Sequence, residues 1–129
     1  TLVHQTAETI LHLAQMGDVI LVGRGASVVT RELDNVFHVR LVGSVAKRIE
    51  RVQQVYELDR PAAIEFINRK DKGRRRYLKE HYHEDIDDPL LYHLIINTDR
   101  IRSEDAARLI SDEVIRRFHL DRQEAAIEI

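Results

Sequence analysis

One stretch decides the fold class of this 129-residue chain: Val19-Ile20-Leu21-Val22-Gly23-Arg24-Gly25-Ala26-Ser27. Its four apolar residues form a short continuous run between glycines, a pattern typical of a strand buried on both faces of a parallel sheet. The glycine-arginine-glycine turn would follow at the carboxyl end of that strand, where open α/β sheets bind ligands. We therefore expect an α/β fold with a ligand site at this turn.

Patterns typical of helices and strands alternate on both sides of this stretch. Apolar residues at helical spacing predict one helix before it, and capped amphipathic segments predict further helices after it. Two more apolar runs predict strands. The expected order is helix 2–16, strand 19–22, helix 27–33, strand 36–42, helix 45–56, a helix from about 59, a strand within 90–98 and helix 103–118. This order predicts a short parallel sheet of about three strands flanked by helices.

The composition indicates a single cytoplasmic domain. With 43% hydrophobic residues, the chain can bury one modest core, which we expect in residues 1–119, followed by a tail at 120–129. The absence of cysteine excludes a disulfide framework and cysteine zinc sites. No apolar run approaches the roughly 20 residues of a membrane span, and no signal peptide is visible. We therefore expect no membrane association.

Residues 68–77 gather six cations and one carboxylate in a chain whose formal net charge is -2. Asp71 and Arg74 stand three residues apart and so share one face of the expected helix. Arg74 could clamp phosphate oxygens together with Arg69, Arg75 or Arg76. The carboxylate of Asp71 could accept a hydrogen bond from a ribose hydroxyl or orient an arginine. A solvated helix face is the alternative interpretation of such a basic run. Arg24 could likewise be an exposed residue of a plain strand-to-helix turn.

Other polar residues do not indicate a catalytic or metal centre. The segment 81–89 is rich in histidine and acidic residues but lacks metal-ligand spacing, so we expect a polar loop and no metal site. His38 and His93 are interpreted as packed or edge histidines. No serine has the context of a nucleophile elbow, and a catalytic triad is not expected.

These pieces, in this order, resemble the cytidylate kinase-like family of nucleoside monophosphate kinases. The resemblance runs from about Leu2 to Phe118. It rests on Val19–Ala26, on Phe37–Val42 with Arg48 and Arg51 in the next helix, on Asp71-x-x-Arg74, and on Leu91–Thr98. It implies a P-loop kinase-like three-layer fold in which an arginine-rich lid, about residues 59–88, closes over ATP and a pyrimidine nucleotide.

The resemblance also implies roles for the residues of the glycine turn. Arg24, flanked by Gly23 and Gly25, matches the family's arginine after the central strand, which contacts the nucleoside monophosphate. Gly25 stands where cytidylate kinases have an aspartate. The cytosine contact of that aspartate is therefore missing, and the resemblance does not fix CMP as the substrate.

In the lid, Asp71 and Arg74 match the family's Asp-x-x-Arg, which is implicated in holding the acceptor nucleotide. Ile67 stands where another lid arginine is expected, and Arg69 is close enough in sequence to substitute for it. The resemblance thus implies Arg74 and Arg69 as catalytic residues, and Asp71 and Arg74 as substrate-binding residues.

The sequence contains no G-x-x-x-x-G-K-[ST] motif, the loop that cradles phosphates and whose Ser/Thr holds Mg²⁺. In the family this loop lies upstream of the first helix, so we expect the chain to be the C-terminal two thirds of the fold. ATP and Mg²⁺ are expected to bind only in the complete domain. The chain alone is expected to be inactive.

The expected function is phosphoryl transfer from ATP to a (d)CMP-type nucleotide, or UMP, in the complete protein. The alternative is a non-catalytic regulatory or oligomerisation module on the same scaffold. Apolar surface left uncovered by a missing strand predicts a homo-oligomer. Nucleic-acid binding is not favoured, because only 5% of residues are aromatic and the net charge is slightly negative.

Overall fold

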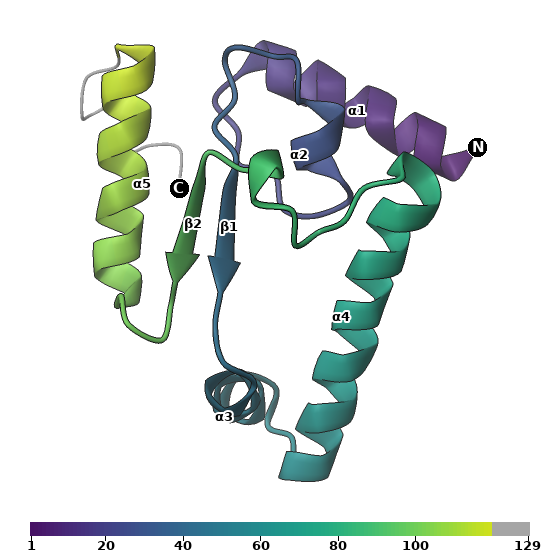
Figure 1. Ribbon diagram of the computed structural model, residues 1–129, viewed down its shortest axis with the longest axis vertical. Helices are drawn as coiled ribbons and strands as arrows, with labels where there is room; N and C mark the ends of the chain where they lie inside the picture. Colours follow the sequence, from purple (N-terminus) through teal and green to yellow (C-terminus); the bar gives the residue numbers. More distant parts are fainter. Residues whose placement is uncertain (120–129) are drawn as a thin grey trace.

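The computed structural model describes residues 1–119 of the chain (Figure 1). The expected C-terminal tail, 120–129, lies outside the described residues. The elements, in chain order, are α1 (Leu2–Met16), α2 (Ala26–Val29), β1 (Val39–Val42), α3 (Val45–Tyr56), α4 (Arg60–Tyr82), the 3-10 helix η1 (Pro89–Leu91), β2 (Leu94–Asn97) and α5 (Ser103–Phe118). The long helices start and end close to the residues predicted from caps and apolar stripes.

The described residues form a short open parallel sheet among helices, which confirms the predicted α/β class. β1 and β2 pair in parallel, with Val39 opposite Leu94 and Val42 opposite Asn97. The predicted strand 36–42 is shorter than expected, and the N-terminal part of the predicted strand 90–98 is the helix η1. The described sheet thus has two strands, where about three were expected.

The prediction of a strand at Val19–Val22 is wrong for this structure. The segment forms no regular element, and its side chains are not buried, since Val19, Ile20 and Val22 are 40%, 60% and 89% exposed. A strand persists only where its backbone groups find partners, and β1 pairs in the described sheet with β2 alone. The apolar run indicated the capacity to form a strand, but it carried no information about a neighbour.

Local capping explains why α3 and α4 begin where they do. The side chains of Ser44 and Asp59 accept hydrogen bonds from backbone amides three residues later, and Pro61 lies in the first turn of α4, where no amide is needed. α4 then runs without interruption through Gly73. No atom lies within 4 Å of the position a Cβ would take at Gly73, so a close contact does not explain this glycine.

The core between α3 and α4 consists of Ile49, Ala63 and Ile67, each at most 4% exposed. Val52, Leu58 and Phe66 pack against these three residues and are partly buried. Ile67 therefore occupies a position where an arginine would have to bury its charge, which costs several kcal/mol or more. Residue 67 thus belongs to the core between α3 and α4 and not to the arginines of the expected lid.

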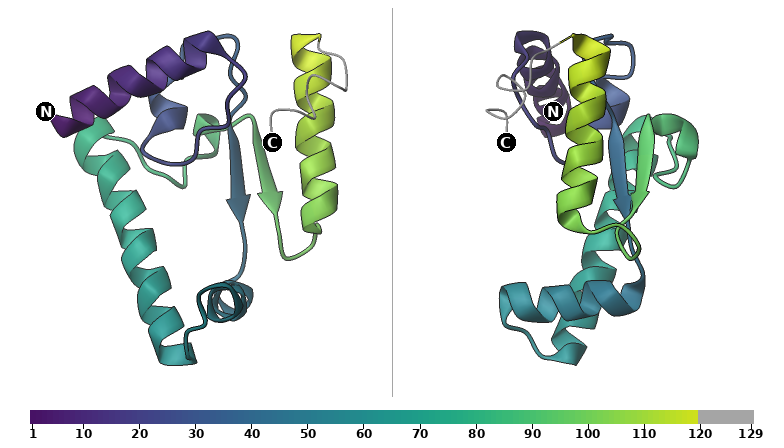
Figure 2. Two further views of the ribbon diagram at one scale, coloured as in Figure 1. Left: turned by 180° about the vertical axis from the view of Figure 1, so that it is seen from behind. Right: turned by 90° about the vertical axis from the view of Figure 1, so that its left-hand side faces the viewer.

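α4 runs along one side of the molecule, from α3 at its first turn to the neighbourhood of α1 and α2 at its last (Figures 1 and 2). α5 lies on the opposite side, next to β2. The loop after α4 returns the chain to the sheet, where η1 leads into β2. The expected lid, residues 59–88, thus comprises α4 and this loop. Among residues 1–119, no helix combines the length and the apolar character needed to span a membrane.

A histidine pair joins the segments that enter β1 and β2. The backbone amide of His38 donates to Nδ1 of His93 at 2.9 Å, and the two rings stack with centroids 5.0 Å apart. The hydroxyl of Thr30 donates to the carbonyl of Ala26 at 2.7 Å, so its 2.8 Å contact with His38 requires a proton on Nε2 of His38. Burial lowers the pKa of both histidines. His38 is therefore buried, whereas His93 is exposed at the entry to β2, and both histidines are neutral near pH 7.

Candidate functional site

The Gly23-Arg24-Gly25 turn packs against the C-terminal part of α4. All three residues have positive φ, of 74°, 54° and 73°. A Cβ on Gly25 would lie 2.8 Å from the ring of Tyr82, so only glycine fits both the backbone and the space. The guanidinium of Arg24 lies 5.9 Å from the ring centroid of Tyr77, within cation–π range. The structure thus brings the predicted Arg24 to the predicted lid helix.

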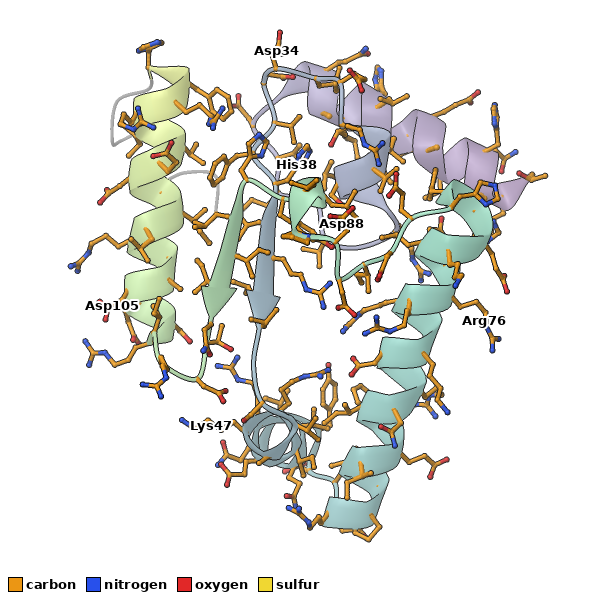
Figure 3. The ribbon with its side chains drawn as sticks, viewed as in Figure 1. Asp34, His38, Lys47, Arg76, Asp88 and Asp105 are labelled. Atoms are coloured by element: carbon orange, nitrogen blue, oxygen red, sulfur yellow. The ribbon has the colours of Figure 1, made fainter. Side chains whose placement is uncertain are left out.

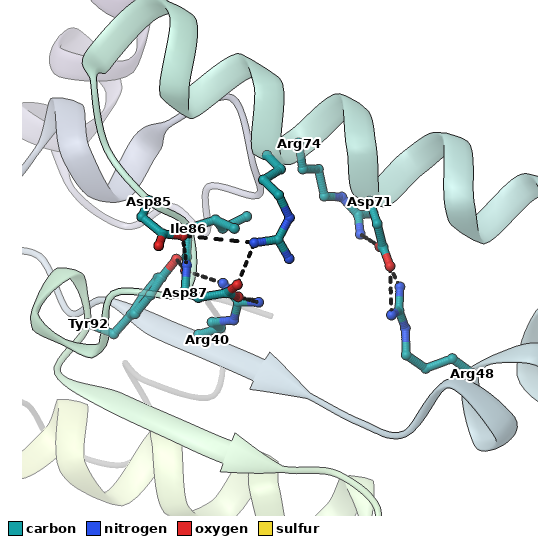
Figure 4. A network of polar contacts seen from close by, with 9 residues as sticks. Arg40, Arg48, Asp71, Arg74, Asp85, Ile86, Asp87 and Tyr92 are labelled. Carbon is teal, nitrogen blue, oxygen red and sulfur yellow. Dashed lines mark hydrogen bonds and ion pairs between the residues drawn. The ribbon is translucent and has the colours of Figure 1, made fainter.

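A bidentate ion pair joins α3 to the middle of α4. The two terminal nitrogens of Arg48 donate to the two carboxylate oxygens of Asp71 at 2.6 and 2.9 Å (Figure 4). These hydrogen bonds are the main reason why the pKa of Asp71 is lowered, and they raise the pKa of Arg48. Arg74 lies 3.8 Å from the same carboxylate, as the shared helix face predicts. Asp71 therefore holds Arg48 in this structure, and its role toward a nucleotide stays a prediction.

A second cluster connects β1, the loop after α4, and α4 itself. Arg40 donates to the carbonyl of Ile86 and, at 3.0 Å, to the carboxylate of Asp87, and its guanidinium lies 5.8 Å from the ring centroid of Tyr92. The other oxygen of Asp87 accepts a hydrogen bond from Arg75. The hydroxyl of Tyr92 donates to the carbonyl of Ile86 at 2.9 Å. Figure 4 shows this cluster beside the Arg48–Asp71 pair.

The arginines of α4 are divided between its faces. Arg75 lies four residues after Asp71 and therefore shares its helix face. Arg69 lies two residues before Asp71, which places it about 200° from Asp71 around the helix. Arg69 instead lies over the ring of Phe66, with 5.8 Å between its guanidinium and the ring centroid. Arg76 points away from the sheet (Figure 3). The structure does not bring Arg69 to the Asp71–Arg74 group, and its catalytic role stays a prediction.

Arg24 reaches α4 close to this group. Its contact residue, Tyr77, follows Arg74 by three residues, which is about 4.5 Å along the helix axis. The candidate site is therefore a group of cations around the middle and C-terminal part of α4. It comprises Arg24, Arg40, Arg48, Arg74 and Arg75, with Asp71 and Asp87 between them.

Sequence reasoning assigned no role to Arg40, Arg48 or Asp87. One signal for Arg40 was available, because a single arginine interrupts the apolar strand Val39–Val42. Arg48 belongs to the motifs that carried the resemblance. Asp87 had no such signal, since it meets Arg40 across 47 residues of sequence.

Neither the structure nor the sequence shows a Mg²⁺-ATP site among the described residues. No three histidine or acidic side chains among residues 1–119 are grouped closely enough to hold a metal ion. The chain also lacks the G-x-x-x-x-G-K-[ST] motif. The arginines of the site offer donors suited to an anion, and the expectation that ATP and Mg²⁺ bind only in the complete domain stays a prediction.

The family comparison covers the whole of this site. A family model described as the cytidylate kinase-like family matches residues 1–100. No curated protein matches the chain. The matched residues include the glycine turn, both strands, α3, α4 and every arginine of the candidate site.

Proposed function

Because the chain belongs to the cytidylate kinase-like family, we propose that Arg24, Asp71 and Arg74 form the acceptor-nucleotide part of a phosphoryl-transfer site. The chain is a nucleoside monophosphate kinase-like domain. The proposed acceptor is a (d)CMP-type nucleotide or UMP, the proposed donor is ATP, and the proposed location is the cytoplasm. The proposal for these residues is confined to binding and orienting the acceptor.

The observation that carries the proposal is the Arg48–Asp71–Arg74 group. Phosphoryl transfer depends almost wholly on positioning and on charge stabilisation. Asp71 uses both oxygens to fix Arg48, while Arg74 is 63% exposed and makes no hydrogen bond among the described residues. Arg74 therefore has its planar set of donors available for a phosphate, 3.8 Å from a carboxylate whose charge attracts it.

Arg24 supports the same proposal from a different element. Arg24 is exposed, and its guanidinium lies beside the ring of Tyr77 and forms no ion pair with a carboxylate among the described residues. A phosphate between Arg24 and Arg74 would be approached by cations from both the glycine turn and α4. The monophosphate would thereby be fixed in position, which is the main contribution a protein makes to this reaction.

Isothermal titration of the chain with CMP and with UMP tests the proposal. Arg74→Gln should weaken binding of the preferred nucleotide by about 10- to 100-fold, the range expected for losing hydrogen bonds to a charged group. Arg76→Gln is the matched control, because Arg76 lies on the same helix and is 73% exposed. Its ion pair with Glu80, at 3.9 Å, is long and exposed and lies outside the site. This control should change the Kd by less than about twofold.

Two outcomes contradict the proposal. One is that neither nucleotide binds at millimolar concentration. The other is that the Arg74 and Arg76 variants lose affinity equally, which would indicate a general effect of charge rather than a site.

A non-catalytic oligomerisation module is the second candidate, and one observation favours it. Apolar side chains on and after α1 are unusually exposed, with Leu2 at 78%, Met16 at 69% and Val22 at 89%. This candidate predicts a chain that stays associated and indifferent to nucleotide after Arg24→Ala. Sedimentation with and without CMP separates it from the first proposal, which predicts a response to CMP that the Arg24 variant loses.

A further inference from the structure

Two arginines from different elements meet at the carboxylate of Asp87. Arg40, on β1, donates to Oδ1 at 3.0 Å, and Arg75, on α4, donates to Oδ2. This convergence of guanidinium groups on one anion is also the arrangement that binds phosphate. Arg75 is the main reason why the pKa of Asp87 lies below its usual range, so the carboxylate is ionised near pH 7. Asp87 thus supplies an anion where a phosphate could also be held.

Arg75 belongs to this cluster and adjoins the proposed acceptor site. It follows Arg74 directly and shares a helix face with Asp71, four residues earlier. Its charge contributes to lowering the pKa of Asp71. A phosphate bound beside Arg74 would therefore lie within reach of the long side chain of Arg75.

The two arginines are held with different strength. Arg40 is only 22% exposed, donates to the carbonyl of Ile86 and lies over Tyr92, so it stays in place without Asp87. Arg75 is 52% exposed, and its remaining carboxylate contact is with Asp85 at 3.8 Å. Exposed ion pairs are weak in water. Arg75 is therefore the partner that an incoming anion can take.

We propose that Asp87 competes with the nucleotide phosphate for Arg75. In the nucleotide-free chain Asp87 holds Arg75 away from the acceptor site, and a nucleoside monophosphate releases Arg75 and binds its guanidinium. Arg40 keeps Asp87 and the loop in place throughout. This inference rests on the proposed function and adds to it an internal contact that lowers the apparent affinity for phosphate-bearing ligands.

The magnitude of the effect follows from the population of the released arginine. The apparent Kd equals the intrinsic Kd divided by the fraction of molecules that can bind. An exposed ion pair that holds Arg75 most of the time leaves a minor fraction released. Removal of the Asp87 charge should therefore tighten CMP binding by about two- to fivefold.

Calorimetric titration of Asp87→Asn with CMP and with cytidine tests this competition. CMP should bind about two- to fivefold more tightly than to the unmodified chain, while the affinity for cytidine, which has no phosphate, should not change. Asparagine keeps an acceptor oxygen for Arg40. Asp87→Ser is measured alongside, and thermal unfolding shows that each variant is folded.

Asp85→Asn is the matched control, because it removes the same charge from the same loop. Asparagine retains the oxygen that accepts the amide of Asp87 at 2.9 Å. It should change CMP affinity by less than about twofold, since Asp85 lies 3.8 Å from Arg75. In an Arg75→Gln background, Asp87→Asn should no longer tighten binding, because the arginine under competition is gone.

The outcomes separate this inference from the proposed function. Equal CMP affinity of the unmodified and Asp87→Asn chains overturns the competition alone. So does equal tightening by the Asp85 and Asp87 variants, tightening of cytidine, or tightening that persists without Arg75. Failure of every variant to bind CMP overturns the proposed function, and the competition with it.

Discussion

The N-terminal half of α4 is held by buried apolar side chains, whereas its C-terminal half combines one buried leucine, Leu78, with several ion pairs. Ala63 and Ile67 pack against Ile49 of α3 and are almost fully buried. Beyond them, Asp71 pairs with Arg48 and Arg75 pairs with Asp87. The four side chains of these ion pairs are 34–52% exposed. One helix thus combines a buried apolar base with a part whose ion pairs are open to water, an arrangement compatible with the lid expected at residues 59–88.

The largest expected effect comes from breaking the apolar half. Ile67→Ala should lower the free energy of unfolding by about 2–5 kcal/mol, because it removes buried methyl groups and leaves a cavity between α3 and α4. Urea denaturation measures the change. Ile64→Ala, on the same helix but 36% exposed, is the control and should cost clearly less. An equal decrease in the free energy of unfolding at the two positions would show that burial of Ile67 does not hold this half of α4.

A smaller effect is expected from breaking the bidentate pair of the charged half. A double-mutant cycle with Arg48→Met and Asp71→Asn should give a coupling energy of about 1 kcal/mol, reduced by partial exposure but raised by the two parallel hydrogen bonds. The pair Arg102–Asp105, at 3.5 Å and with Arg102 79% exposed, provides a reference cycle. Its coupling should be at most about 0.5 kcal/mol. A coupling energy at Arg48–Asp71 no larger than this reference would show that the two parallel hydrogen bonds add no stability.

The smallest expected effect is the response of the same pair to acid. Arg48 lowers the pKa of Asp71 in the folded chain, so the folded state binds this proton less readily than the unfolded state does. The contribution of the pair is complete above the ordinary aspartate value, about 3.9, and is lost as the pH falls through the lower folded value. Unfolding of the unmodified chain and of Asp71→Asn should be compared at pH 6, 4.5 and 3. A stability difference that remains constant down to pH 3 would argue against the ionised pair.

Sequence could predict the helices because their signals are local. Ser44 and Asp59 mark the starts of α3 and α4 through side-chain bonds to amides three residues away. The strand expected at Val19–Val22 failed for the opposite reason, because pairing depends on a partner that the apolar run does not specify. Register and neighbours in a sheet are non-local, and β1 meets β2 across about 55 residues.

The candidate site was predictable in the same uneven way. Asp71 and Arg74 were identified because a spacing of three residues fixes a shared helix face. The same helical geometry places Arg69 and Arg74 about 140° apart, so their spacing in the sequence already assigns them to different faces of the helix. The meeting of Arg40 with Asp87 depends on how the loop after α4 returns to the sheet, and no local pattern contains that path.

The two glycines of the turn before α2 differ in what surrounds them, and this has a mechanical consequence. No atom lies within 4 Å of a Cβ position on Gly23, whereas one on Gly25 would collide with Tyr82 near the end of α4. Gly25 is therefore in direct packing contact with α4 through Tyr82, whereas Gly23 has no such contact. A shift of α4 would therefore press on the turn at Gly25 and move the Tyr77 ring on which the Arg24 guanidinium lies, so the position of Arg24 depends on that of the helix.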